Sequence, residues 1–280
     1  MRYYLLSFAL AFIISFSQSA FSQIFQTSDS GKITTFLAQA DQSTLVIFDV
    51  DEVLIQGEDQ IFHPKYKKTK FGAKLDEYGH KYGTDFMNKM LSIILNTRKA
   101  VLVDKKILEM INYLSHKKIP SIALTHCSTG SMGVIEKVED WRINELKGLG
   151  IVFSTFANNL IFHKLHGKNK RSPLLKKGIL FTNFVDKSLV LQQFIESEGF
   201  KPKKIIFIDD DRKNLELTEK LCIAIGIDFI GIEYLAATNK PCLPFNEERM
   251  HFQFTILEKQ HKWLSDDEAD QLLQTSKQQG

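Results

Sequence analysis

The stretch "LVIFDVDEVLI", residues 45–55, places three carboxylates directly behind an apolar run. The run itself, residues 45–48, predicts a strand that is buried on both faces. Asp49 and Asp51 follow it one residue apart, and Glu52 stands beside them. Like charges held this close shift each other's pKa, so a fold keeps such a cluster where a cation binds or where a solvated turn exposes it.

A second acidic cluster stands in the same position behind another apolar run. "KKIIFIDDD", residues 203–211, ends in consecutive aspartates that include Asp209 and Asp210. If both runs are central strands of one parallel sheet, their carboxyl ends meet at the same edge, and Asp49, Asp51 and one or both of the later aspartates converge there. Oxygen ligands without a histidine or thiolate at matching spacing favour Mg²⁺, so these four aspartates are the predicted metal ligands.

Apolar strands alternate with amphipathic helices through most of the chain. Further strands are expected at residues 121–125 and 228–234, and helices at 103–114, 133–149, 187–196 and 215–225. This order predicts an α/β fold built on a doubly wound parallel sheet, with its site at the carboxyl ends of the strands.

Two stretches interrupt this alternation. Residues 56–101 carry a basic, aromatic run followed by a helical pattern, which predicts a small cap insertion. Residues 152–183 resemble short strands around a turn-rich segment, which predicts a smaller insertion. Both are expected to cover a site, so residues 23–280 form one domain. The tail after Met250 ends in a polar, glutamine-rich segment that is expected to fray.

The first residues have the pattern of an export signal. Arg2 precedes an apolar run, residues 3–14, that is too short to span a membrane, and the small residues Ala20 and Ser22 follow. This predicts a signal peptide over residues 1–22, cut after Ser22, and no stable membrane span in the mature protein. The alternative is an uncleaved N-terminal anchor. In either case we expect a secreted or periplasmic protein.

The composition of the chain excludes few functions, but it limits the kinds of binding partner that we expect. A formal net charge of +3 does not indicate a dedicated nucleic-acid binder, and 44% apolar residues indicate a packed globule. The three cysteines, Cys127, Cys222 and Cys242, leave at least one thiol without an intramolecular partner. A bond between Cys222 and Cys242 is conceivable but is not demanded. The oligomeric state is open.

Several residues at the same predicted edge suit a phosphate. Mg²⁺ held by a few carboxylates usually has a phosphate as its remaining partner. Thr125 ends the second strand, His126 follows it, and Lys187 begins a helix from which its ammonium could reach an anion. Together with the metal they form an electrostatic cradle for a transferring phosphoryl group. Lys176 and Lys177 compete with Lys187 for this role.

These motifs together resemble those of the haloacid dehalogenase (HAD) superfamily of phosphohydrolases. The resemblance spans roughly residues 43–235, and its nearest functional neighbours are the secreted acid phosphatases of that superfamily. The matching positions are Asp49, Asp51 and Val53 in "FDVDEV", Thr125 in "IALT", Lys187, and Asp209, Asp210 and Asn214 in "IIFIDDDRKN". Glu52 departs from the pattern, because many relatives carry a neutral residue there.

The resemblance implies a role for each carboxylate. Asp49 would be the nucleophile, and Asp51 would protonate the leaving group and then activate water. Asp210 would ligate Mg²⁺ with Asp49 and the backbone carbonyl of Asp51, while Asp209 would be a second ligand or a support. Thr125 and the lysine would hold the phosphate.

The expected function is therefore a secreted, Mg²⁺-dependent phosphatase that hydrolyses small phosphomonoesters through an aspartyl-phosphate intermediate. The alternative is a non-catalytic HAD-like binding or effector protein that keeps the acidic pocket without useful turnover.

Overall fold

The structure, a computed structural model, describes residues 20–156, 158–167 and 169–278. The first 19 residues of the predicted signal peptide therefore lie outside the described residues. Ser22 is the first residue of strand β1 (Ser22–Thr27), and the carbonyl of Phe21 accepts a hydrogen bond from the N–H of Phe229 at 2.8 Å. The predicted cut after Ser22 would remove the first residue of this strand.

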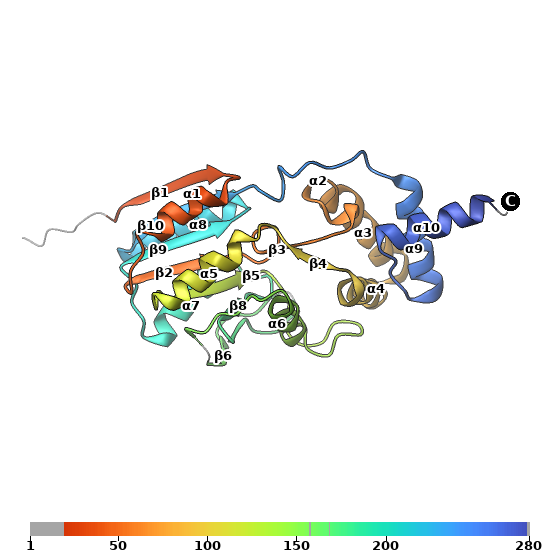
Figure 1. The fold of residues 1–280 in the computed structure, drawn as a ribbon. Helices are drawn as coiled ribbons and strands as arrows, with labels where there is room; N and C mark the ends of the chain where they lie inside the picture. The colour runs from red at the N-terminus through yellow and green to blue at the C-terminus, as the bar shows by residue number, and fades with distance from the viewer. Residues whose placement is uncertain (1–19, 157, 168, 279–280) are drawn as a thin grey trace, which may run out of the picture.

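A central sheet of eight strands forms the body of the molecule (Figure 1). In spatial order it runs β1–β10–β9–β2–β5–β8–β7–β6. Its other strands span Thr44–Phe48 (β2), Ser121–Thr125 (β5), Leu160–Ile161 (β6), Leu174–Lys176 (β7), Ile179–Phe181 (β8), Lys204–Asp209 (β9) and Asp228–Tyr234 (β10). Neighbours from β1 to β8 pair in parallel, whereas β7 and β6 add antiparallel strands at one edge.

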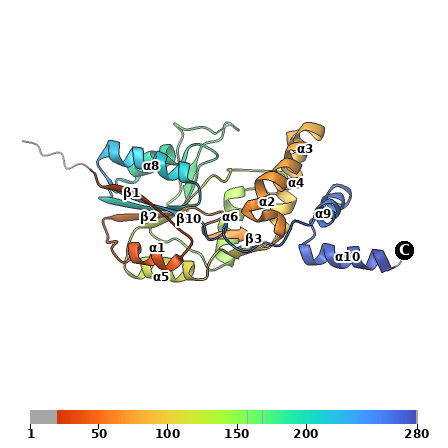
Figure 2. The same cartoon turned by 90° about the horizontal axis from the view of Figure 1, so that it is seen from above.

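Helices cover both faces of this sheet (Figure 2). One layer contains α1 (Ser30–Leu37), α5 (Lys106–His116) and α6 (Val138–Gly148), and the other contains α7 (Lys187–Glu198) and α8 (Arg212–Ile225). Strand β2 sends Val46 and Phe48 into the first layer and Leu45 and Ile47 into the second. The predicted α/β fold with a doubly wound, mostly parallel sheet is confirmed, and β2 is buried on both faces as expected.

The segment predicted as a cap lies beyond the carboxyl edge of the sheet (Figure 1). A two-stranded antiparallel ribbon, β3 (Ile55–Gly57) with β4 (Ala100–Leu102), connects it to the core. Between these strands lie η1 (Gln60–Phe62), α2 (Pro64–Tyr66), η2 (Lys67–Gly72), α3 (Ala73–Tyr82) and α4 (Thr84–Thr97).

The end of the chain packs against this segment. Helices α9 (Glu247–Gln260) and α10 (Asp266–Gln278) follow a long connection from β10 (Figure 1), so the polar, glutamine-rich segment expected to fray is helical as far as Gln278. Phe254 and Trp263 share an apolar cluster with Phe62 and Tyr78. The cap is therefore built from two segments that lie far apart in the sequence.

The segment 152–183, expected as a smaller insertion, contributes strands β6 to β8 to the central sheet. Strand β8 pairs in parallel with β5, with Thr125 opposite Phe181. Much of this segment therefore widens the core sheet.

Two smaller findings concern the cysteine thiols and the helices of the described part. Cys127, Cys222 and Cys242 are all free, so the conceivable bond between the last two is not formed. Within residues 20–278, apart from the two undescribed positions, no helix has the length and apolarity needed to cross a membrane.

Candidate functional site

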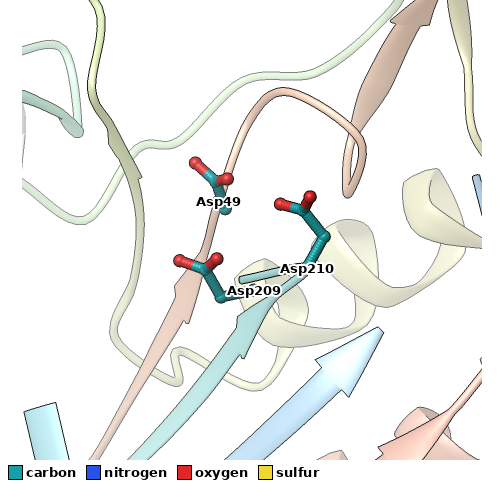
Figure 3. A group of neighbouring side chains, drawn as sticks. All are labelled: Asp49, Asp209 and Asp210. Atoms are coloured by element: carbon teal, nitrogen blue, oxygen red, sulfur yellow. The ribbon is translucent and has the colours of Figure 1, made fainter. Parts of the chain in front are cut away.

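Three aspartates from two adjacent strands converge at the carboxyl edge of the sheet. Asp49 follows β2. Asp209 is the last residue of β9, which pairs in parallel with β2, and Asp210 follows it. Each residue contributes a carboxylate oxygen to a group whose members all lie within 4.8 Å of one another (Figure 3). The convergence expected from the two apolar runs is thus present for these three residues.

Lys187 neutralises part of this charge. It is the first residue of α7, is 2% exposed, and places Nζ 2.7 Å from Asp49 Oδ1 and 2.7 Å from Asp209 Oδ2. Of the rival lysines, Lys176 pairs with Asp140 and Lys177 lies exposed in the turn before β8. The structure therefore places Lys187, and neither rival, beside the aspartates.

The pKa values of the cluster reflect an excess of negative charge. Burial raises the pKa of Asp49 well above its usual range, although Lys187 opposes the shift. Burial and the neighbouring Asp209 raise the pKa of Asp210 to about 7. Burial lowers the pKa of Lys187, but the attraction of Asp49 and Asp209 outweighs it and the net shift is upward. One ammonium beside two buried carboxylates and a third, half-buried one leaves a site whose oxygen donors fit a hard divalent cation such as Mg²⁺.

Asp209 is already occupied by protein donors. Besides Lys187, it accepts hydrogen bonds from Asn214 Nδ2 at 3.1 and 3.2 Å and from the N–H of Asp211 at 2.8 Å. Its side chain is fully buried. Asp49 and Asp210 therefore have more oxygen lone pairs available for a metal, and the geometry suits Asp209 better to the supporting role.

The Asp51 side chain turns away from the cluster. Both of its carboxylate oxygens lie near Arg142 Nη2, at 3.2 and 3.3 Å, and its side chain is 37% exposed. Burial raises the pKa of Asp51, but the cations of Arg142 and Lys67 outweigh it and lower this pKa to about 2. The expectation that the Asp51 carboxylate joins the other aspartates is wrong, because a buried guanidinium on α6 holds it.

Thr125 and His126 lie at the same edge, beside the cluster. Thr125 is 1% exposed, and its hydroxyl accepts a hydrogen bond from the N–H of Cys127 at 3.3 Å. His126 Nδ1 lies 3.0 Å from Thr182 Oγ1. Burial and the positive charge of Lys187 lower the pKa of His126, which favours the neutral ring.

Ion pairs between core and cap were not expected from the sequence. Arg98, at the end of α4, lies 3.0 Å from Glu145 on α6, and Arg142 Nη1 lies 2.5 Å from the same glutamate. Both arginine side chains are 5% exposed. The three-residue spacing of Arg142 and Glu145 predicts only a pair within α6 and is common on solvated helices, so the sequence carries no signal for the contact with Arg98.

Glu52 forms a second contact between core and cap. Its Oε1 lies 2.6 Å from Lys67 Nζ, and its buried Oε2 has no hydrogen-bond partner within the described part of the chain. A cavity of about 50 Å³ lies between this loop and the cap, lined in part by Asp51, Glu52, Lys67 and Arg98. A larger cavity, about 860 Å³, lies at the amino edge of the sheet, away from the aspartates.

Residues 26–270 match the model of a family described as "Protein of unknown function (DUF2608)". The chain belongs to this family. The match includes the core, the cap segment and α9, so the DUF2608 unit contains both parts of the molecule.

Curated relatives of this DUF2608 protein include proteins of Rickettsia and Chlamydia. An uncharacterized protein of Rickettsia prowazekii is 26% identical over 268 residues, which cover 94% of this chain and 95% of that protein. A second, from Rickettsia felis, is 30% identical over 190 residues, covering 59% and 62%. A putative outer membrane protein of Chlamydia trachomatis is 32% identical over 65 residues, covering 23% and 25%.

Among solved structures, a HAD family enzyme from Bacteroides thetaiotaomicron, described as a magnesium complex, aligns with 67% of this chain and 92% of its own. The TM-score is 0.34 and the sequence identity is 15%.

Proposed function

We propose that this protein is a Mg²⁺-dependent phosphohydrolase that acts on phosphomonoesters outside the cytoplasm. The observation that carries the proposal is the position of Lys187, whose ammonium lies 2.7 Å from both Asp49 and Asp209 while Asp210 completes the carboxylate group. A buried nucleophile candidate beside a fixed cation and a set of oxygen donors suits phosphoryl transfer, which depends mainly on positioning and charge neutralisation.

In the proposed first step, a carboxylate oxygen of Asp49 attacks phosphorus. The new oxygen–phosphorus bond forms as the bond to the ester oxygen breaks, and the leaving group takes a proton. Lys187 lies against Asp49, where its charge stabilises the phosphoryl oxygens in the transition state. Asp49 and Asp210 would hold Mg²⁺, which when bound neutralises charge on the phosphate.

In the proposed second step, water attacks the phosphorus of the aspartyl phosphate, which releases inorganic phosphate and restores the Asp49 carboxylate. Asp51 is the proposed proton carrier in both steps. Its contact with Arg142 favours the carboxylate form, so proton donation to a leaving group requires that this contact lengthen.

The proposed location outside the cytoplasm rests on the export-signal pattern at the start of the chain. The printed name of the Chlamydia trachomatis relative, a putative outer membrane protein, agrees with it.

One observation favours a second candidate function, a non-catalytic binding protein with a HAD-like pocket. The proposed acid–base residue, Asp51, is engaged by Arg142. A pocket that keeps its metal ligands but immobilises its proton carrier would bind phosphate groups without efficient turnover.

Release of inorganic phosphate from a panel of aryl and alkyl phosphomonoesters, with Mg²⁺ and with a chelator, tests the proposal. We expect release that depends on Mg²⁺ and falls to background in Asp49→Asn. The matched control, Asp267→Asn, changes an exposed aspartate on α10 and should retain the activity. If the wild-type protein binds Mg²⁺ and phosphate but releases none from any ester, the binding function replaces the enzymatic one.

A further inference from the structure

An exposed phenylalanine lies on a strained loop close to the candidate site. Phe184 is 60% exposed and has a φ of 64°, and the preceding Asn183 has a φ of 49°. Consecutive non-glycine residues with left-handed backbone are uncommon, and the conformation is least favourable for a bulky side chain. A glycine at position 184 would adopt this φ without strain. Phenylalanine here incurs the strain without gaining the burial that an aromatic ring usually provides.

Neighbouring loops hold this backbone in place. Asn183 is fully buried, and its Nδ2 donates to the carbonyl of Arg171 at 2.7 Å while its Oδ1 accepts from the N–H of Thr129 at 3.3 Å. Its own N–H donates to the carbonyl of Cys127 at 3.1 Å. These hydrogen bonds hold the backbone of Asn183 in one conformation. Backbone strain persists in a fold when surrounding contacts hold it in this way.

The loop lies at the carboxyl edge of the sheet, beside the aspartates. The N–H of Thr182 donates to the carbonyl of Thr125 at 2.9 Å, and the hydroxyl of Thr182 contacts His126. Lys187, which contacts Asp49, follows Phe184 by three residues, so their Cα atoms lie at most about 11 Å apart. Phe184 is therefore an exposed residue on a loop that borders the candidate site.

We propose that Phe184 is a specificity-determining residue that contacts the organic group of the substrate and favours aryl or similarly flat, apolar phosphoesters. This inference rests on the proposed function, since it assumes that a phosphoryl group binds beside Asp49 and Lys187. An aromatic ring at the rim of such a site stacks with, or packs edge-to-face against, an aryl group and removes both surfaces from water. Single exposed apolar residues are ordinary on protein surfaces. Phe184 differs because a buried network fixes it in a strained conformation at the edge of a site.

Binding of phosphonates tests this inference without requiring turnover. Phenylphosphonate and methylphosphonate share the phosphoryl group and lack the ester oxygen that a phosphatase cleaves. Calorimetry in the presence of Mg²⁺ should show that the wild-type protein prefers phenylphosphonate. This preference should fall by about three- to tenfold in Phe184→Ala and Phe184→Gly, the range expected for an aromatic pair, and persist in Phe184→Tyr.

The controls separate contact from folding. Ile223→Ala removes a side chain of similar exposure, 54%, from the last turn of α8 and should leave both affinities unchanged. Phe184→Gly should melt at a higher temperature than Phe184→Ala, because glycine relieves the positive φ.

Three results would overturn the inference: no phenyl preference in the wild-type protein, no binding of either phosphonate, or equal losses for both ligands in Phe184→Ala. A phenyl preference that depends on Phe184 in a protein without phosphatase activity would uphold the contact and refute only the proposed catalysis.

Discussion

Arg142 Nη2 lies 3.2 Å from Asp51 Oδ1, so the second aspartate of the "DVD" sequence pairs with helix α6 while the first, Asp49, faces Lys187. Two carboxylates one residue apart thus occupy different electrostatic environments. Asp49 is buried with a raised pKa, and Asp51 is held as the anion with a pKa of about 2. The difference suggests that Arg142 sets how readily Asp51 can carry a proton.

Substitution of Arg142 by methionine should change the dependence of turnover on the leaving group. Without the guanidinium, the pKa of Asp51 rises and a larger fraction carries the proton that an alkyl leaving group needs. We expect the ratio of alkyl to aryl phosphate turnover to increase relative to wild type. Because both turnover rates are measured on the same variant, their ratio does not depend on how much of the protein is folded. Arg142→Lys keeps a positive charge and should stay closer to the wild-type ratio. An unchanged or lower ratio in Arg142→Met would contradict this control of Asp51.

The two aspartates should differ in covalent labelling. Asp49→Asn removes the proposed nucleophile, so no phosphoenzyme should form from any substrate. Asp51→Asn should accept phosphate from aryl phosphates, whose leaving groups need little protonation, and then hydrolyse slowly because proton transfer is typically worth about a hundred- to ten-thousand-fold in rate. Rapid-quench labelling with both substrate types measures this, and labelled Asp49→Asn would refute the assignment.

Asp210 should make the metal-free protein lose stability as the pH rises. Its pKa is about 7 in the folded protein and 3.8 ordinarily, so between these values the folded state holds a proton that the unfolded state has lost. The free energy of unfolding should therefore fall from about pH 4 to about pH 7. Asp210→Asn should flatten this fall in chelator-treated samples. Mg²⁺ should raise the melting temperature of the wild type most above pH 7, where the carboxylate is free to bind it.

Loss of the Lys187 charge should destabilise the metal-free fold. Lys187→Met leaves Asp49 and the fully buried Asp209 without their shared counter-ion, and breaking a buried pair in this way costs about 3–5 kcal/mol. Lys177→Met, which changes an exposed lysine, should stay within about 0.5 kcal/mol of wild type. Denaturant unfolding measures both, and similar values for the two variants would show that Lys187 is not the counter-ion of the cluster.

The C-terminal helices should contribute to the stability of the cap. Trp263 Nε1 donates to Asp59 Oδ2 at 3.0 Å, and both residues are buried. Trp263→Phe keeps an aromatic ring but leaves the carboxylate without this donor, so we expect a loss of about 1–3 kcal/mol. Lys262→Ala, at an exposed neighbouring position, should have little effect. Equal unfolding curves for wild type and Trp263→Phe would show that the tail is not coupled to the cap.

The sheet and the carboxylate cluster could be predicted from the pattern of apolar and acidic residues along the chain. An all-apolar run such as Leu45–Phe48 can be satisfied only by burial on both faces, and parallel strands bring their carboxyl ends to one edge. Asp49, Asp209 and Asp210 converge for that reason, since each stands at the end of such a run. These relationships follow from local pattern and a general rule of topology.

Ion pairs between distant parts of the chain, by contrast, could not be predicted before the tertiary structure was known. Arg142 and Asp51 are 91 residues apart, and nothing in the spacing of either predicts the other. The selection of Lys187 over Lys176 and Lys177 likewise depended on which ammonium could reach Asp49. The packing of the C-terminal helices against the cap likewise depends on the tertiary structure. In each case a buried charge or apolar face requires a partner, but the identity of that partner depends on which elements the folded chain brings within a few ångströms.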